Sequence, residues 1–342
     1  MSVPSHPSKA APLMNRRLGI SVWHALITVA WLGAVACGTR PPRTTELRVA
    51  LVTPGSIADA AWNAGAYAGL MAIRDSLKLP VSHIEARTPA EQEEALRTYA
   101  AEGYRLIFAH GFEFQNAAER VAADYPDAII AITSGQRVQG NVVPLIFRLR
   151  EPSYLAGMVA GAVSKSGKIG FVGGIELPPV RIGFEAWARG ARAVNPAIDA
   201  RATYLNNFDD AVAGREAAVA LIRLGVDVLH HNADAAGLGV FRAATEFPAV
   251  YVIGANKDQT ELAPDRVLGS AVIDLPRAFL LIAGEVAEGR FVPREESFGL
   301  ESGVLEYRPN SRLETLLPPG FEVKLQAAHD SIVRGLLIVE GW

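Results

Sequence analysis

The sequence predicts an α/β protein built from two doubly wound lobes, each a parallel sheet covered by helices and joined to the other by a hinge. Short apolar runs of strand length alternate with longer segments of helical period from residue 47 to about residue 254. This alternation restarts after a helix rich in small residues near residue 150. A chain of 342 residues also has room for two domains beyond a leader segment. Because parallel strands need helical crossovers, the pattern favours two sheets covered on both faces.

The first array runs from residue 47 to about residue 150. Its opening strand is bounded by Pro54 and Gly55, which are turn residues. Thr88, Pro89 and Glu91 form the pattern of an N-cap, a first-turn proline and a capping-box glutamate, and so predict where a helix begins. Strands are expected at 47–52, 81–85, 106–109 and 129–133, and helices at 62–77, from residue 89 onward and at 115–124.

The second array begins with the small-residue helix at 151–164, which contains Gly157 and Gly161. Further strands are expected at 168–172, 199–204, 226–230 and 250–254, and helices at 182–194, 211–224 and 237–246. The predicted N-terminal lobe is 47–150, with approximately 260–295 returning to it, and the C-terminal lobe is 151–259 with approximately 296–342. In such sheets, ligands bind beyond the carboxyl ends of the strands. The loops expected to line a site are 53–63, 110–116, 173–184, 206–211, 231–239 and 255–260.

The first 37 residues have the organisation of a secretory leader. Basic residues Arg16 and Arg17 precede an apolar run from 18 to 36, and small residues precede Cys37, the only cysteine in the chain. We therefore predict a signal peptide at 1–36, lipidation of Cys37 and a tether at 37–46. An uncleaved anchor, a plain signal peptide and a twin-arginine signal are the alternatives. The expected location is the extracytoplasmic face of a cell membrane, where a lipid-bearing cysteine anchors the protein.

The composition argues against several classes of function. The formal net charge is -3, and three basic residues (Lys9, Arg16 and Arg17) lie in the leader, so the rest of the chain is more acidic still. An acidic chain disfavours a nucleic-acid partner. No G-x-S-x-G nucleophile motif and no clear metal-ligand spacing is present, so neither catalysis, a metal nor a cofactor is expected. His110, the His230-His231 pair and the glycines of 167–174 are more simply interpreted as structural features than as a catalytic, metal or phosphate site.

An ordered set of short motifs resembles the basic membrane protein family, the lipoprotein solute receptors of ABC transporters that include purine-nucleoside receptors. The resemblance runs from about residue 46 to the C-terminus. It is carried by Asp59-Ala60-Ala61-Trp62-Asn63, Ala122-Ala123-Asp124-Tyr125-Pro126-Asp127, Asn141-Val142, Tyr154-Leu155-Ala156-Gly157, the 168–174 stretch, Gly190-Ala191, Val194-Asn195-Pro196, Phe208-Asp209-Asp210, Gly225-Val226-Asp227, Ala236-Gly237-Leu238-Gly239-Val240 and Asp258-Gln259.

The resemblance implies a type I periplasmic-binding-protein-like fold that closes its two lobes around a small solute. The solute would be a nucleoside or a similar flat heterocycle, delivered to an ABC transporter permease. The alternative is a ligand sensor of the same fold that takes no part in transport. Stacking is expected from Trp62, Phe112 and Phe208, although Trp62 and Phe208 have the alternative of a place in the core. The candidate ligand-binding residues are Asp59, Trp62, Asn63, Gly111, Phe112, Phe208, Asp234, Gly237 and Asn256.

Three positions depart from the pattern of the family's nucleoside receptors. Asn256 stands where the family segment Gly-x-Asp-x-Asp-Gln has an aspartate, Ile273 replaces a ligand-contacting lysine, and Thr133 stands where an aspartate is expected. An amide retains hydrogen bonding but loses the stronger charge-assisted bond. The sequence therefore predicts weak binding of plain nucleosides.

Overall fold

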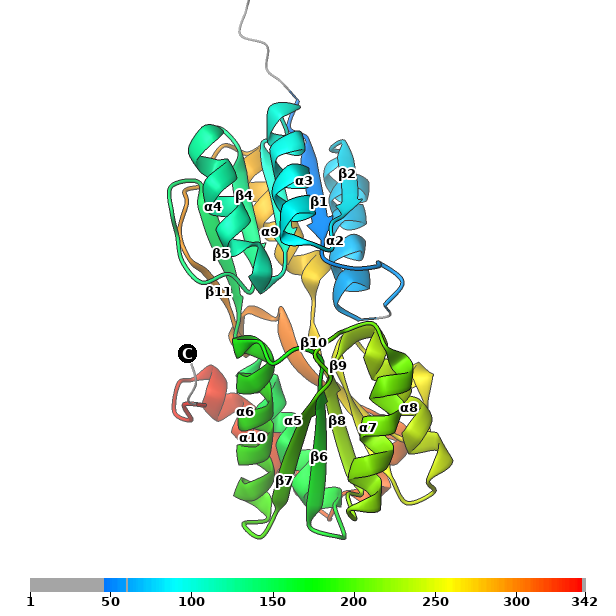
Figure 1. Cartoon of the computed structure of the whole chain (residues 1–342). Coiled ribbons are helices and arrows are strands. Elements are labelled where there is room, and N and C mark those ends of the chain that lie inside the picture. The colour runs from blue at the N-terminus through cyan, green and yellow to red at the C-terminus, as the bar shows by residue number, and fades with distance from the viewer. Residues whose placement is uncertain (1–45, 60, 340–342) are drawn as a thin grey trace, which may run out of the picture. The chain divides into compact units, whose positions relative to one another are not determined.

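The computed structural model describes residues 46–59 and 61–339, and Glu46 begins the compact unit of the chain. The predicted signal peptide, the lipid-accepting Cys37 and most of the tether lie outside these described residues. Within residues 46–59 and 61–339, no helix has the length and apolar character needed to cross a bilayer. The unit contains two six-stranded sheets, which confirms the predicted pair of α/β lobes (Figure 1).

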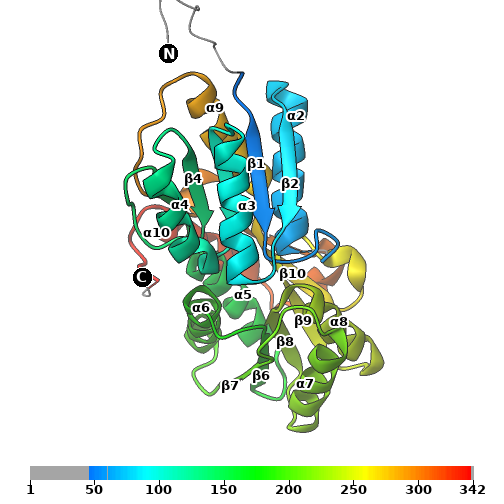
Figure 2. The same ribbon diagram turned by 45° about the horizontal axis from the view of Figure 1, so that its top comes forward.

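The N-terminal lobe contains a parallel sheet in the order β11-β5-β4-β3-β1-β2. Side chains alternate across it: Val49 and Leu51 join the core on one face, whereas Ala50 and Val52 join the core on the other. Helices α3 and α4 cover one face, and α9 lies on the opposite face (Figures 1 and 2). The elements of this lobe are β1 (Val49–Thr53), α2 (Trp62–Leu77), β2 (Val81–Glu85), α3 (Pro89–Ala101), β3 (Leu106–His110), η1 (Phe112–Phe114), α4 (Gln115–Asp124), β4 (Ile129–Thr133), β5 (Val142–Phe147), α9 (Leu275–Ala287) and β11 (Glu296–Phe298).

The C-terminal lobe contains the second sheet, in the order β12-β10-β9-β8-β6-β7, in which only β12 runs antiparallel to its neighbour. Glycines let α5 and α6 pack backbone to backbone: a Cβ on Gly190 would lie 1.9 Å from the carbonyl oxygen of Tyr154. The elements of this lobe are α5 (Arg150–Val163), β6 (Lys168–Gly173), α6 (Pro178–Val194), β7 (Asp199–Tyr204), α7 (Ala211–Arg223), β8 (Val228–Asn232), α8 (Asp234–Glu246), β9 (Tyr251–Asn256), η2 (Thr260–Leu262), β10 (Val267–Ile273), η3 (Leu300–Ser302), β12 (Leu305–Pro309), η4 (Ser311–Leu316) and α10 (Phe321–Val333).

Three crossovers connect the lobes, between β5 and α5, between β10 and α9, and between β11 and β12. Arg148 ties two of them together, because its side chain pairs with Glu151 (Nε to Oε1, 2.6 Å) and with Glu301. The other carboxylate oxygen of Glu151 accepts the backbone N–H of Leu300 at 2.9 Å. Multiple crossovers of this kind form the hinge of a two-lobed binding fold.

The chain returns to the N-terminal lobe later than we expected. The expected segment was approximately 260–295, but β10 pairs with β9 and β12 in the second sheet, so the return begins at Asp274. Conversely, β11 (Glu296–Phe298) pairs with β5 in the first sheet although it lies beyond residue 295. Strand β5 was not among the predicted strands. It contains Pro144, and proline is rare inside β-sheets. The capping box of Thr88 and Glu91 is confirmed.

Candidate functional site

A cavity lies between the two lobes, where strands of both sheets end; its empty space is about 520 Å³ with open solvent included. It adjoins a second space of about 1020 Å³, open solvent included, since Pro54, Glu113, Leu177, Phe208 and Asp234 line both. We refer to the first space as the inner cavity, to the second as the outer part, and to the two together as the cleft. Its other described lining residues are Gly55, Asp59, Trp62, Asn63, Arg87, Pro89, Gln92, Gly111, Phe112, Ser134, Leu149, Ile175, Pro179, Val180, Asn206, Asn207, Asp209, Asn232 and Asn256.

Trp62, the first residue of α2, lines the cleft. Its ring stacks on that of His110, with centroids 4.1 Å apart and planes inclined by 26°. Burial lowers the pKa of His110 to about 3, so the imidazole is neutral. Its Nε2 lies 3.1 Å from the carbonyl oxygen of Trp62 and its Nδ1 lies 2.9 Å from the hydroxyl of Thr133. His110 therefore positions Trp62, and Thr133 orients His110.

Phe112 and Phe208 bring aromatic rings to the cleft from opposite lobes. Phe112 opens the short helix η1 after Gly111, whose φ of 144° is one that glycine adopts readily. Phe208 packs directly over Gly174, where a Cβ would lie 2.1 Å from its ring. The carbonyl oxygen of Phe208 accepts the N–H of Ala236 at 2.9 Å, which fixes the loop against α8. The cleft thus has aromatic surfaces contributed by both lobes.

Asp59 stabilises the start of α2, a structural role that was not predicted from the sequence. Its carboxylate accepts the backbone N–H groups of Ala61 (3.0 Å), Asn63 (2.7 Å) and Ala64 (2.9 Å). These groups belong to the unpaired N-terminal donors of α2. The residue also lines the outer part of the cleft. Asp59 therefore fixes the helix start that carries Trp62 and Asn63, and its charge is balanced by three donors.

Asp234 and Asn256 meet on the C-terminal side of the cleft. The Asn256 amide donates to Asp234 Oδ1 and to Asn232 Oδ1, each at 3.3 Å. Burial, followed by the charges of Asp59 and Glu113, raises the pKa of Asp234 well above its usual range. Asp234 and Asn256 have positive φ angles, as do Ser134 and Asn206 in the same cleft. Strained backbone of this kind gathers at ligand sites.

Gly237, a candidate ligand-binding residue, and Ile273, where the family has a ligand-contacting lysine, do not line the cleft. Gly237 lines neither space of the cleft, and a Cβ there would lie 2.3 Å from Nδ1 of His231. Its lack of a side chain makes room for that histidine, whose Nε2 lies 2.9 Å from Gln259 Oε1. Ile273 is buried in the core and does not line the cleft either. A lysine at that position would therefore need a different local arrangement to reach a ligand.

Asn232 and Glu113 also line the cleft, although neither was among the candidate ligand-binding residues. Asn232 ends β8 and precedes α8, and Glu113 lies inside one of the loops named as lining a site. Position at a strand end was therefore a usable signal for both, but no residue-type pattern singled them out. Among residues 46–59 and 61–339, no group of three or more His, Cys, Asp or Glu side chains is arranged to hold a metal ion.

Comparisons with known proteins agree with this geometry. A family model described as "ABC transporter substrate-binding protein PnrA-like" matches residues 46–317. Basic membrane protein A2 of Borrelia garinii subsp. bavariensis is 28% identical over 340 residues, covering 95% of this chain and 96% of that protein. The transcriptional activator protein Med of Bacillus subtilis is 26% identical over 79% of this chain and 84% of its own length. Among solved structures, an ABC transporter system solute-binding protein from Aeropyrum pernix K1 has a TM-score of 0.79 at 22% identity, covering 85% of this chain and 92% of that chain.

Proposed function

The chain belongs to the basic membrane protein family of PnrA-like ABC transporter substrate-binding proteins, and we propose that it captures a small flat solute between its lobes for delivery to a membrane permease. The single observation that carries this proposal is the cavity between the lobes that aromatic side chains from both lobes line. Such a cavity suits a ligand that is sandwiched when the hinge closes. The family and the fold are those of substrate-binding proteins.

The shape of the lining favours a flat or apolar body. Trp62 and Phe112 come from the N-terminal lobe and Phe208 from the C-terminal lobe, so a planar ligand can contact rings on both sides. Leu149, Leu177 and Val180 add apolar surface from the C-terminal lobe and its crossover. The polar side chains of the inner cavity, those of Glu113, Ser134, Asn232, Asp234 and Asn256, would set the orientation of the ligand.

Retention of a solute by the purified protein tests this proposal even while the identity of the ligand is open. The protein is isolated under native conditions, denatured, and the released small molecules are identified by mass spectrometry. The wild type should release a compound that Phe208→Ala retains poorly. As the control, Phe247→Ala changes a partly buried phenylalanine of the same lobe that does not line the cleft. Equal retention by both variants and the wild type would place the solute elsewhere.

A thermal-shift panel of nucleosides, nucleobases and thiamine-like heterocycles complements this experiment. We expect plain nucleosides to bind weakly, because Asn256 supplies no charge and Ile273 lies in the core. Loss of two charge-assisted hydrogen bonds lowers affinity by about two to four orders of magnitude, at roughly 1.5–3 kcal/mol each. Micromolar binding of adenosine or inosine would overturn this expectation.

A ligand sensor is the second candidate, and the similarity to Med, a protein whose name describes a transcriptional activator, favours it. The two functions differ in what happens after the lobes close. Deleting the candidate permease genes abolishes uptake of the solute if the protein serves transport. If the protein is a sensor, uptake is unchanged by loss of the protein, and a response to the solute is lost instead.

The location that we propose is a membrane surface, with Cys37 carrying the lipid anchor. Cys37 is the sole cysteine of the chain and follows the small residues that end the apolar run. Cys37→Ser should release the protein from the membrane fraction or block its processing. Unchanged membrane association with an uncleaved leader would indicate a transmembrane anchor.

A further inference from the structure

The charges along the cleft are strongly unequal. Its described lining contains four carboxylates, those of Asp59, Glu113, Asp209 and Asp234, but one positively charged side chain, that of Arg87. A solute that enters this space loses part of its hydration, so the charges of the lining side chains act on it more strongly than they would in bulk water. The charge of the lining is therefore a determinant of which solutes bind.

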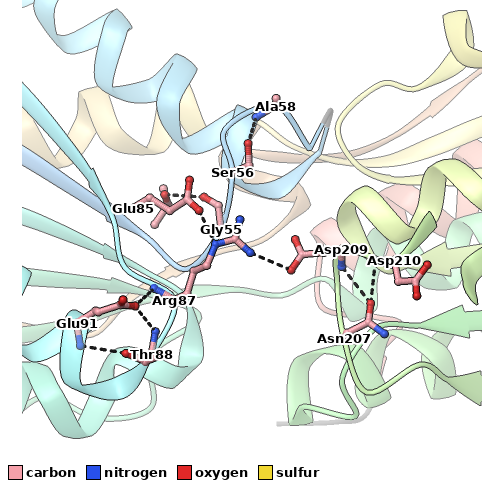
Figure 3. Close-up of polar contacts among 11 residues, drawn as sticks. Gly55, Ser56, Ala58, Glu85, Arg87, Thr88, Glu91, Asn207, Asp209 and Asp210 are labelled. Carbon is pink, nitrogen blue, oxygen red and sulfur yellow. Dashed lines mark hydrogen bonds and ion pairs between the residues drawn. The ribbon is translucent and has the colours of Figure 1, made fainter. Parts of the chain in front are cut away.

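Two of these carboxylates are already compensated. The three backbone N–H groups at the start of α2 stabilise Asp59. Asp209, in the C-terminal lobe, faces Arg87 across the mouth of the cleft at 3.4 Å (Figure 3). Arg87 also pairs with Glu85 at 2.7 Å, so its charge is shared between two acids. The positive charge of Arg87 is therefore already paired with the carboxylates of Glu85 and Asp209.

Glu113 and Asp234 are left without a cation. No ion pair reaches either side chain from the rest of the described chain, and Asp234 has only the amide of Asn256 at 3.3 Å. Asp234 is 7% exposed, so water gives little compensation. Burial together with neighbouring carboxylates raises the pKa of Asp234, whereas the side chain of Glu113 stays exposed to the cleft. A positive charge beside either carboxyl group would favour its ionised form.

One residue of the cleft lining has an unsatisfied acceptor. Asn63 is 5% exposed, and its buried side-chain oxygen has no hydrogen-bond partner within the described residues. A buried acceptor without a donor is destabilising, so such groups in native proteins usually have a hydrogen-bond partner. Asn63 lines the same space as Glu113 and Asp234. The unmet requirement in this part of the cleft is therefore for N–H donors.

We infer that the solute carries a positively charged nitrogen with N–H donors, an ammonium or amidinium group, attached to a flat or apolar body. The nitrogen would lie among Glu113, Asp234 and Asn63, and the body would contact the aromatic rings of the inner cavity. Aromatic faces attract cations through their quadrupole, so the rings and the carboxylates favour the same ligand. This inference rests on the proposed function, since it describes the solute of that same cleft.

Proton linkage gives this arrangement a distinctive signature. In the empty cleft Asp234 keeps its proton to a higher pH than an ordinary aspartate, and a bound cation favours the carboxylate. Binding of the cation should therefore release a proton at pH values below the pKa of the empty site. Affinity should rise with pH up to the pKa of the empty site and then level off. The other ionisable groups facing Asp234, namely Asp59, Glu113, Asp209 and the paired Arg87, shift the midpoint of this dependence but not its sign.

Calorimetric titration with matched probes tests the inference. Benzamidine and benzamide have nearly the same shape and differ in charge, and tryptamine and tryptophol form a second such pair. A hydrogen bond to a charged group is worth roughly 1.5–3 kcal/mol, so each cation should bind about ten- to a hundredfold more tightly than its neutral partner. Titrations in buffers with different ionisation enthalpies should show proton release.

Charge-removing variants assign the preference to the cleft. Asp234→Asn should remove most of the preference for the cation. The variant should fold, because asparagine is compatible with the positive φ of 47° at this position. Glu113→Gln, a change at a side chain open to the cleft, serves as the second variant should the first fold poorly. Glu94→Gln removes an exposed carboxylate of α3 that does not line the cleft, and it should leave the preference intact.

The outcomes separate this inference from the proposed function. If neutral probes bind as tightly as cations and Phe208→Ala weakens both, the cleft binds solutes but the charge preference is refuted. The same holds if the cation preference survives both Asp234→Asn and Glu113→Gln. If no probe binds and the purified protein retains no solute, the proposed function fails together with the inference. Tighter binding of the cations with proton release supports it.

Discussion

Replacing Asp59 by alanine tests how the start of α2 is held in the cleft. The carboxylate accepts three backbone N–H groups, of Ala61, Asn63 and Ala64, at 2.7 to 3.0 Å. The residue is 2% exposed, so water cannot easily replace these bonds while the local fold persists. Removing the carboxylate leaves three donors without their acceptor at the helix start that carries Trp62.

The expected loss of stability is larger than that of an ordinary surface substitution. Replacing a helix-capping side chain by alanine costs roughly 0.5–2 kcal/mol, and hydrogen bonds to a charged group are worth roughly 1.5–3 kcal/mol each. Partial rehydration through the adjoining cleft offsets part of this. We therefore expect Asp59→Ala to destabilise the protein by about 2–3 kcal/mol. At roughly 2–4 °C per kcal/mol for a domain of 150–250 residues, the melting temperature should fall by about 4 °C or more.

Differential scanning fluorimetry without ligand measures this loss, and Asp59→Asn is the matched control. Asparagine caps helix starts about as well as aspartate and retains one acceptor oxygen, so it should lose less than half as much stability. Affinity for the solute should also fall in Asp59→Ala, since Trp62 and Asn63 depend on the same helix start. A melting temperature that stays within about 1 °C of the wild type, with affinity lost, would show that Asp59 acts mainly on the ligand.

Three further predictions concern the capping box, the rim and the helix pair of the C-terminal lobe. Thr88→Ala removes the acceptor for the N–H of Glu91 and should cost about 1 kcal/mol in urea denaturation, whereas Thr88→Ser should be nearly neutral. Asp209→Asn breaks the exposed ion pair with Arg87 and should weaken solute binding less than about fivefold, with the difference vanishing at high salt; a larger effect would mean a direct role in binding. Gly190→Ala places a Cβ where α5 approaches α6 most closely and should destabilise the protein by about 1–3 kcal/mol or more, and unchanged stability would contradict the close packing.

Much of the fold follows from local signals in the sequence. Most of the predicted strands are apolar runs of five or six residues, and the capping residues Thr88 and Glu91 mark the start of the helix at Pro89. What local signals leave out is pairing across long sequence separations. β10 joins the second sheet through contacts with β9 and β12, and β11 joins the first through β5. Sequence periodicity does not identify those pairing partners, so the segment expected to return to the N-terminal lobe, approximately 260–295, was misplaced.

The site was predictable as a set of loops but not as a set of interactions. Rules for doubly wound sheets and the resemblance to a family named Trp62, Phe112 and Phe208, and all three line one cavity. The role of Asp59 depends on backbone groups within its own loop, and that of Gly237 depends on His231 behind it. The uncompensated carboxylates of Glu113 and Asp234 emerge only when both lobes are placed, because their neighbours come from different lobes.

The most direct test of a solute held between the two lobes is a crystal structure of the protein with the compound that it retains. We expect ligand density in the cavity, in contact with Trp62 and Phe112 of one lobe and with Phe208 of the other. A nitrogen of the ligand should lie near Asp234. Density outside this cavity, for example in the groove beside α10 that Leu325 and His329 line, would contradict it.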